Sequence, residues 1–103
     1  MLRPLIVKNS LLAKLLRVEG IVLYPFIFFS SKSPGDILIN HELIHISQIK
    51  RLGVCRFYFL YLKEYFACRI KGMGHHQAYR SISFEVEAYE KESARPHHLN
   101  DYF

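Results

Sequence analysis

The chain has 103 residues, half of them hydrophobic and 15% aromatic, which excludes a chain disordered by composition and allows one modest apolar core. Its net charge of +5 permits anionic partners. However, the sequence has no Gly-rich phosphate loop and no dense basic run with interleaved aromatic residues, so we expect no nucleic-acid binding. We expect a single domain over residues 1–103.

The N-terminal part of the chain predicts little regular structure. Residues 5–17 combine Leu and Ile with Lys, and we expect a short helix or an irregular arm there. Residues 11–17 are amphipathic and basic, which is compatible with peripheral contact with a membrane. Two cysteines, Cys55 and Cys68, are too few for a disulfide framework. We therefore expect a cytoplasmic protein, with membrane association left open.

Residues 21–29 are β-branched and aromatic, and their composition predicts a buried strand. This run is far shorter than the roughly 20 residues that a membrane-spanning helix needs. Pro25 lies inside it and favours an edge strand or a bulge. Because a lone strand is only marginally stable, it must pair with another copy of the chain, with a substrate, or with a stretch of this chain that its sequence does not reveal.

A helix is expected from about Asp36 to Leu52, following a loop rich in Ser, Pro and Gly. Its apolar residues surround most of the helix, which is the pattern of a buried helix. Gly53 follows its last turn, as at many helix C-termini.

The same stretch contains His41-Glu42-Leu43-Ile44-His45. Four residues apart on a helix, His41 and His45 project from one face and can reach a single Zn²⁺. Glu42 can then act as the general base toward a water molecule that the metal activates. The short motif therefore supplies two candidate ligands and a candidate base, and Gln48 continues the same face of the helix.

Two further helical segments are expected. The first covers residues 56–71, and we expect its apolar stripe to lie in the core; the stripe consists of Phe59, Leu62, Phe66 and Ile70. The second runs from Gln77 to about Ala94 in one or two pieces, with Ser83 a candidate cap for a helix beginning at Phe84. Residues 97–103 are expected at the surface.

A catalytic zinc site needs a third protein ligand and an open position. The candidates are Glu85, Glu87, His75 and His76. Glu85 is favoured, because Ala88 is small enough to let its helix approach the motif closely. Two residues along a helix are about 200° apart, so Glu85 and Glu87 cannot both face the metal.

Taken together, the His-Glu-x-x-His motif and the later segment Glu85-Val86-Glu87-Ala88-Tyr89 resemble the gluzincin group of zinc metallopeptidases. The later segment is similar to the Glu-x-x-Ala-Asp motif of membrane-bound prenyl-protein proteases and heat-shock zinc proteases, whose first Glu binds the metal; the resemblance assigns that role to Glu85. Tyr89 stands where that motif has an Asp that orients a histidine ligand. The pattern His-Glu-Leu-x-His-x-x-Gln also resembles small uncharacterised bacterial zincin-like proteins.

From the predicted elements we expect an α+β, mostly helical fold, a minimal zincin-like core of about three helices with one short β-element at its edge. The resemblance covers residues 36–94. It implies a Zn²⁺-dependent hydrolase of peptides or proteins, in which substrates pair with the sheet edge. Tyr79 or Tyr89 is a candidate donor to the oxyanion. Two alternatives stay open: a non-catalytic zinc-binding module, and a metal-free helical interaction protein at a membrane surface. The oligomeric state is also open.

Overall fold

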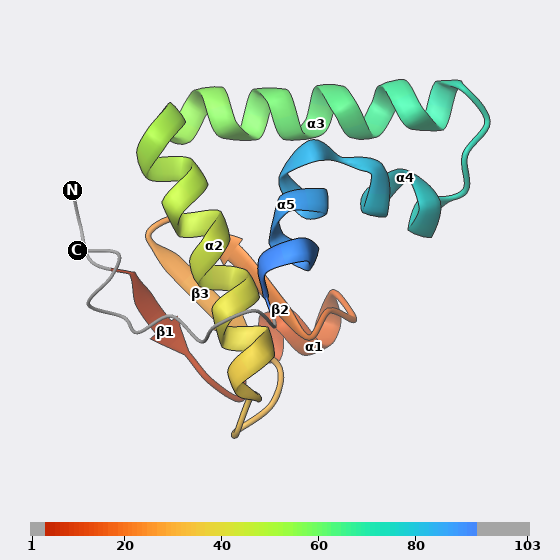
Figure 1. Ribbon diagram of the computed structural model, residues 1–103. Helices are drawn as coiled ribbons and strands as arrows, with labels where there is room; N and C mark the ends of the chain where they lie inside the picture. Colours follow the sequence, from red (N-terminus) through yellow and green to blue (C-terminus); the bar gives the residue numbers. More distant parts are fainter. Residues whose placement is uncertain (1–3, 93–103) are drawn as a thin grey trace.

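The computed structural model describes residues 4–92 and has an α+β, mostly helical fold, as expected (Figure 1). Within these residues the elements are, in chain order, β1 (Leu5–Val7), α1 (Leu11–Leu15), β2 (Gly20–Leu23), β3 (Phe26–Phe29), α2 (Asp36–Leu52), α3 (Val54–Ile70), α4 (His75–Ser81) and α5 (Ser83–Lys91). No helix in the described part of the chain has both the length and the apolar character needed to cross a membrane.

The three strands form one small sheet in the order β1-β3-β2. The single strand predicted over residues 21–29 is wrong: it is a hairpin of β2 and β3, and Pro25 lies in the turn between them. Residues 5–7, predicted as helix or arm, pair with β3 in parallel, while Leu11–Leu15 is helical. The chain therefore supplies the pairing partners that the strand needed.

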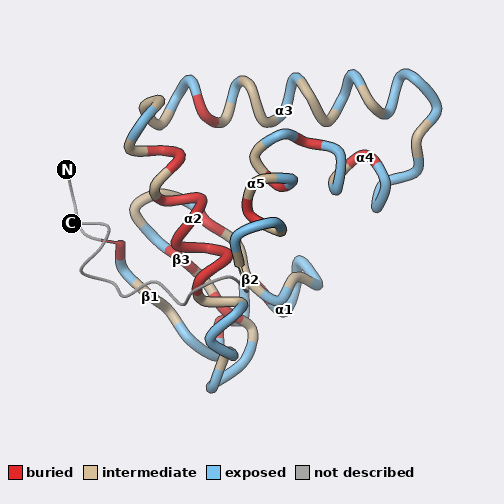
Figure 2. Tube along the Cα trace, viewed as in Figure 1, coloured by how far each residue is buried: buried red, intermediate tan, exposed pale blue. Residues whose placement is uncertain are grey.

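Helix α2 occupies the centre of the fold, and both of its predicted ends are confirmed. Figure 2 shows that buried positions concentrate along it. Its apolar residues pack against the sheet and the start of α3. The buried core cluster consists of Val22, Ile27, Phe29, Leu43, Ile46, Ile49 and Phe57. The polar residues of the motif lie on another side of α2, against α5.

Helix α3 crosses the end of α2; α4 returns alongside α3, and α5 lies mainly against α2 (Figure 1). The prediction that its apolar stripe is buried is wrong, because Phe59, Leu62, Phe66 and Ile70 are all more than half exposed. The opposite stripe, with Phe57, Tyr58 and Tyr61, packs inward instead. The tyrosine hydroxyls find acceptors there, so these amphipathic rings can be buried without leaving a polar group unpaired.

The last helical segment is in two pieces, α4 and α5, which meet at Ile82. The prediction that Ser83 caps the second piece is wrong, since the cap position is Ile82. Instead, the backbone N–H and the hydroxyl of Ser83 both donate to the Glu64 carboxylate on α3, at 2.8 and 3.0 Å. Residues 93 and 94 of the predicted helix, and the predicted surface end at 97–103, lie outside the described residues.

Candidate metal centre

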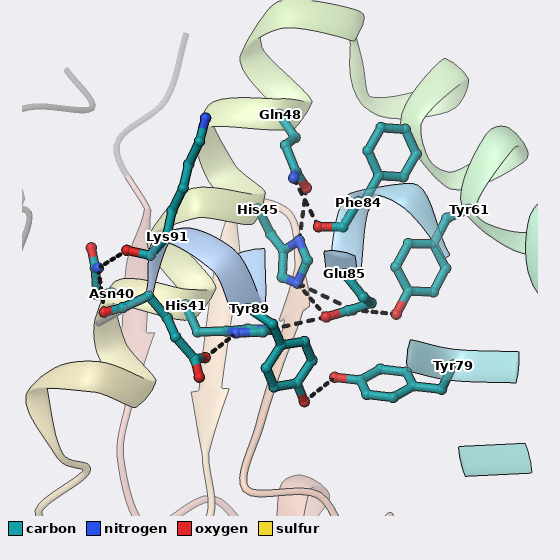
Figure 3. A network of polar contacts seen from close by, with 11 residues as sticks. Asn40, His41, His45, Gln48, Tyr61, Tyr79, Phe84, Glu85, Tyr89 and Lys91 are labelled. Carbon is teal, nitrogen blue, oxygen red and sulfur yellow. Dashed lines mark hydrogen bonds and ion pairs between the residues drawn. The ribbon is translucent and has the colours of Figure 1, made fainter. Parts of the chain in front are cut away.

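The two motif histidines and Glu85 meet at the contact between α2 and α5 (Figure 3). The Nε2 atom of His41 is 2.9 Å from Glu85 Oε1, and that of His45 is 3.2 Å from the same atom. All three side chains are buried. One ligand atom from each lies within 4.8 Å of the others, which makes them a group able to hold a metal ion.

Two of these separations are close to those between neighbouring ligands of a zinc ion. Ligands about 2.0–2.1 Å from a tetrahedral zinc ion are about 3.3 Å from one another. The two contacts between histidine Nε2 atoms and the Glu85 carboxylate, 2.9 and 3.2 Å, are close to that value. The donor set of two imidazoles and one carboxylate is also the set of known catalytic zinc sites that keep a further position open.

The other ring nitrogens of the histidines have their own partners. His41 Nδ1 is 2.6 Å from Glu92 Oε2, and His45 Nδ1 is 2.8 Å from Gln48 Oε1. A carboxylate only accepts hydrogen bonds, so Nδ1 of His41 donates to Glu92. Such contacts fix the orientation of an imidazole and direct its Nε2 toward a metal.

Gln48 also fastens α5 to α2. Its amide nitrogen donates to the Phe84 carbonyl at 3.0 Å and to Glu87 Oε1 at 2.8 Å, which leaves Oε1 of Gln48 as the atom that faces His45. Glu87, the rival third ligand, further contacts Arg51 at 2.9 Å. Glu87 therefore joins α5 to Gln48 and Arg51 of α2, away from the histidines.

Electrostatics couple the three buried groups. Burial favours the neutral form of each imidazole, but hydrogen bonds to Glu85 outweigh it, with help from the Glu42 carboxylate, so the pKa of His41 and that of His45 are both raised. Burial opposes ionisation of Glu85, yet its hydrogen bonds to His41, His45 and Tyr61 hold its pKa well below the usual range. Glu85 is therefore a carboxylate at neutral pH.

Glu42 lies beside this group and lines a groove of about 1220 Å³. Glu42 is buried, and this burial raises the pKa of its carboxyl group. Gly20 at the start of β2 makes room for it: a Cβ atom there would lie 3.1 Å from Glu42 Oε1 and 3.2 Å from the Phe29 ring. The absence of a side chain at Gly20 thus lets the sheet edge approach the candidate base.

One wall of the groove is the free edge of β2, with which no strand in residues 4–92 pairs. Gly20 is opposite Phe29, so Glu19 and Ser30 form the next pair along the ladder. This pair is hydrogen-bonded, because the Ser30 N–H donates to the Glu19 carbonyl at 3.1 Å. Because hydrogen-bonded pairs alternate along an antiparallel ladder, Gly20 and Val22 direct their backbone polar groups away from β3. The Tyr58 hydroxyl donates to the Val22 carbonyl at 2.8 Å. The backbone N–H and carbonyl of Gly20 therefore face the groove.

Tyrosines also line the groove. The Tyr61 hydroxyl donates to Glu85 Oε2 at 2.5 Å, and burial together with this carboxylate raises the pKa of Tyr61. Tyr89 packs edge-on against the His41 ring, with 4.5 Å between ring centroids, and its hydroxyl is 3.3 Å from that of Tyr79 (Figure 3). Both candidate oxyanion donors therefore line the groove.

The other histidine candidates are not brought to the centre. His75 and His76 are exposed at the start of α4 and line the groove, outside the group of His41, His45 and Glu85. His75 Nδ1 instead forms a 2.9 Å hydrogen bond with the Tyr65 hydroxyl.

Sequence reasoning missed three partners of the site. Glu92 takes the histidine-orienting position that Tyr89 leaves without an acid, and its spacing gives a signal: it follows Glu85 by seven residues, two turns along the same face. Asn40, which donates to the Glu92 carbonyl at 2.7 Å, precedes the motif directly. Tyr61 offered no such signal, because nothing in the sequence separates it from the other aromatic residues of α3.

Comparison with known proteins adds no relative: no family model, no curated protein and no solved structure matches the chain.

Proposed function

We propose that the chain is a zinc-dependent hydrolase of peptide bonds, similar in its site to the gluzincins. His41, His45 and Glu85 would hold the zinc ion. The observation that carries the proposal is the meeting of two Nε2 atoms and one carboxylate within 4.8 Å, beside a groove that the general-base candidate Glu42 also lines. A site on a groove supports catalysis over a closed, purely structural metal centre.

Bound zinc would supply Lewis-acid chemistry, polarising the substrate carbonyl and activating water. Glu42 would take the proton from the attacking water and return it to the leaving amine. Its raised pKa suits this task, because the carboxyl group must hold the proton between the two transfers. The hydroxyls of Tyr79 and Tyr89 are the candidate donors to the oxyanion, because both line the groove near His41.

The groove supports a substrate in an extended conformation. The outward backbone of Gly20 offers a donor and an acceptor to an added strand, in the manner of β-augmentation. Apolar residues that line the groove, among them Ile21, Leu38 and Phe57, favour substrates with apolar residues. A cytoplasmic location stays a prediction. Cys55 and Cys68 are both free thiols.

The first test is the zinc content of protein prepared without chelator, for the wild type and three variants. We expect about one zinc per chain in the wild type and in Glu87→Ala, and little in His45→Ala and Glu85→Ala. Glu87→Ala is the matched control, because it removes a carboxylate from the same helix. Zinc loss in Glu87→Ala but not in Glu85→Ala would overturn the ligand assignment.

The second test separates catalysis from metal binding. Glu42→Gln should keep the zinc and lose peptide hydrolysis by several orders of magnitude, because the amide cannot accept the proton. Apolar peptides with fluorescent labels at their termini would serve as substrates. Hydrolysis at the wild-type rate by Glu42→Gln would show that the proposed general base is wrong.

One observation favours a second candidate, a metal-free helical interaction protein. Glu85 accepts hydrogen bonds from both histidines, and His41 has Glu92 as a further acid partner, so the buried polar groups are satisfied by one another. This alternative predicts no zinc in the wild type and none bound on addition of zinc salt. That result would exclude the hydrolase and the zinc-binding module together.

A further inference from the structure

The outer face of α3 carries an exposed apolar stripe. Phe59, Leu62, Phe66 and Ile70 are 65%, 51%, 56% and 87% exposed. They follow one another by three or four residues and therefore line one side of a helix about 25 Å long. Figure 2 shows exposed positions recurring along this helix, on the side away from α4 and α5. Four large apolar side chains in one row on a surface mark an interaction site.

Basic residues border this stripe on both sides. At 100° per residue, Lys63 and Arg69 lie about 60° to either side of the centre of the stripe. Arg56, near the start of α3, and Lys71, just after its end, are also exposed. The single acidic residue of α3, Glu64, lies on another side of the helix and binds Ser83. The exposed face of α3 is thus apolar in the middle, cationic at its borders and free of carboxylates.

We propose that this face of α3 docks onto an anionic lipid surface. The apolar stripe would enter the boundary between headgroups and acyl chains, and the bordering cations would meet the lipid charges. Charge argues against a second copy of the chain as the occupant. Two α3 faces packed together would bring Lys63 and Arg69 of each copy near those of the other, with no carboxylate on α3's outer face to pair with them.

The stripe also adjoins the groove, because Leu62 belongs to both. Docking through α3 would therefore hold the mouth of the groove beside the lipid surface. The inference does not depend on the proposed hydrolysis, because its test measures binding to lipid and not turnover.

The test is sedimentation with vesicles of phosphatidylcholine alone or with about 30% phosphatidylserine. We expect the wild type to bind the anionic vesicles much more tightly than the neutral ones. Phe59→Ser/Phe66→Ser should weaken that binding about tenfold or more, since each ring loses its apolar burial. Lys63→Gln/Arg69→Gln should weaken it about 25-fold, at about fivefold for each cation, and less at high salt. All four side chains are exposed, so circular dichroism should show unchanged folding.

A matched control comes from α1, where Leu11 and Leu15 are 70% and 71% exposed. Leu11→Ser/Leu15→Ser removes a similar apolar surface from residues 11–17, the segment whose sequence is also compatible with membrane contact. Because we assign docking to α3, this variant should leave vesicle binding unchanged. Loss of binding in this variant, with retention in Phe59→Ser/Phe66→Ser, would overturn the assignment to α3. Failure of the wild type to bind anionic vesicles would overturn the proposal. So would self-association that Phe59→Ser/Phe66→Ser abolishes in the absence of lipid, because the stripe would then be an interface between copies.

Discussion

Replacement of Glu92 by Ala should weaken zinc binding without touching a proposed ligand. Glu92 accepts a 2.6 Å hydrogen bond from Nδ1 of His41. Loss of such an orienting partner typically costs between 10-fold and 100-fold in metal affinity. The Glu92 side chain is 22% exposed, so water can replace part of the contact, and we expect the lower end, about tenfold. This corresponds to about 1.4 kcal/mol of binding free energy.

The assay is competition for zinc with a chromophoric chelator at one fixed pH and ionic strength. Glu92→Gln should fall between the wild type and Glu92→Ala, because the amide oxygen still accepts a hydrogen bond but carries no charge. Glu90→Ala is the control: it removes the same charge from an exposed position on α5. Equal affinities for Glu92→Ala and Glu90→Ala would refute the idea that Glu92 orients His41.

Three further results are expected. Gly20→Ala should lower the rate of peptide hydrolysis about tenfold and leave the zinc content unchanged. The added Cβ atom would displace the Glu42 side chain, because the Phe29 ring on its other side is buried. An unchanged rate would contradict this prediction. Zinc affinity should fall as the pH drops through the raised pKa values of His41 and His45, which lie above 6.5, by about tenfold per pH unit for each protonated imidazole. Chelator competition at a series of pH values measures this dependence. An affinity that does not change with pH would contradict the prediction. Chelation should lower the melting temperature by about 10 °C or more but keep the helical circular dichroism.

The motif helix could be predicted from the sequence because every local signal agreed. The loop before Asp36, the apolar pattern and Gly53 gave both ends of α2. The geometry of a helix showed that Glu85 and Glu87, about 200° apart, cannot both face the metal. The choice of Glu85 came from the small Ala88 on its helix and from the resemblance to the gluzincins. In the structure Glu85 faces the histidines and Glu87 faces Arg51. Whether Glu85 binds a metal stays a prediction.

The face that α3 buries could not be predicted, because aromatic residues surround this helix. Periodicity alone gave the stripe of Phe59, Leu62, Phe66 and Ile70, which is exposed. What decides the orientation is long-range: the Tyr58 hydroxyl meets the Val22 carbonyl, and the Tyr61 hydroxyl meets Glu85. Those acceptors belong to elements far away in the sequence, and only the assembled fold shows them.

The strand at residues 5–7 and the hairpin within residues 21–29 were missed for a related reason. Leu5–Val7 is too short to carry a period of its own, and the adjoining Leu-rich stretch favoured helix. Its pairing with β3 is parallel, so no hairpin turn announces it in the sequence. Pro25 did mark a break, but as a turn within the run and not as a bulge in one strand.

The stability of the fold after removal of the metal distinguishes the zinc hydrolase from the structural zinc module, and the contact between α2 and α5 shows why. The apolar core lies between α2, α3 and the sheet, and none of its members is a proposed ligand. At the site, Glu85 can accept hydrogen bonds from His41 and His45, and every buried side-chain polar atom of the described residues has a partner. The fold thus has its own core and a polar contact that the chain can satisfy itself. A structural zinc ion, by contrast, supplies folding free energy that its domain lacks. Loss of helical structure on chelation would therefore favour the structural module, and retention favours a metal held for chemistry.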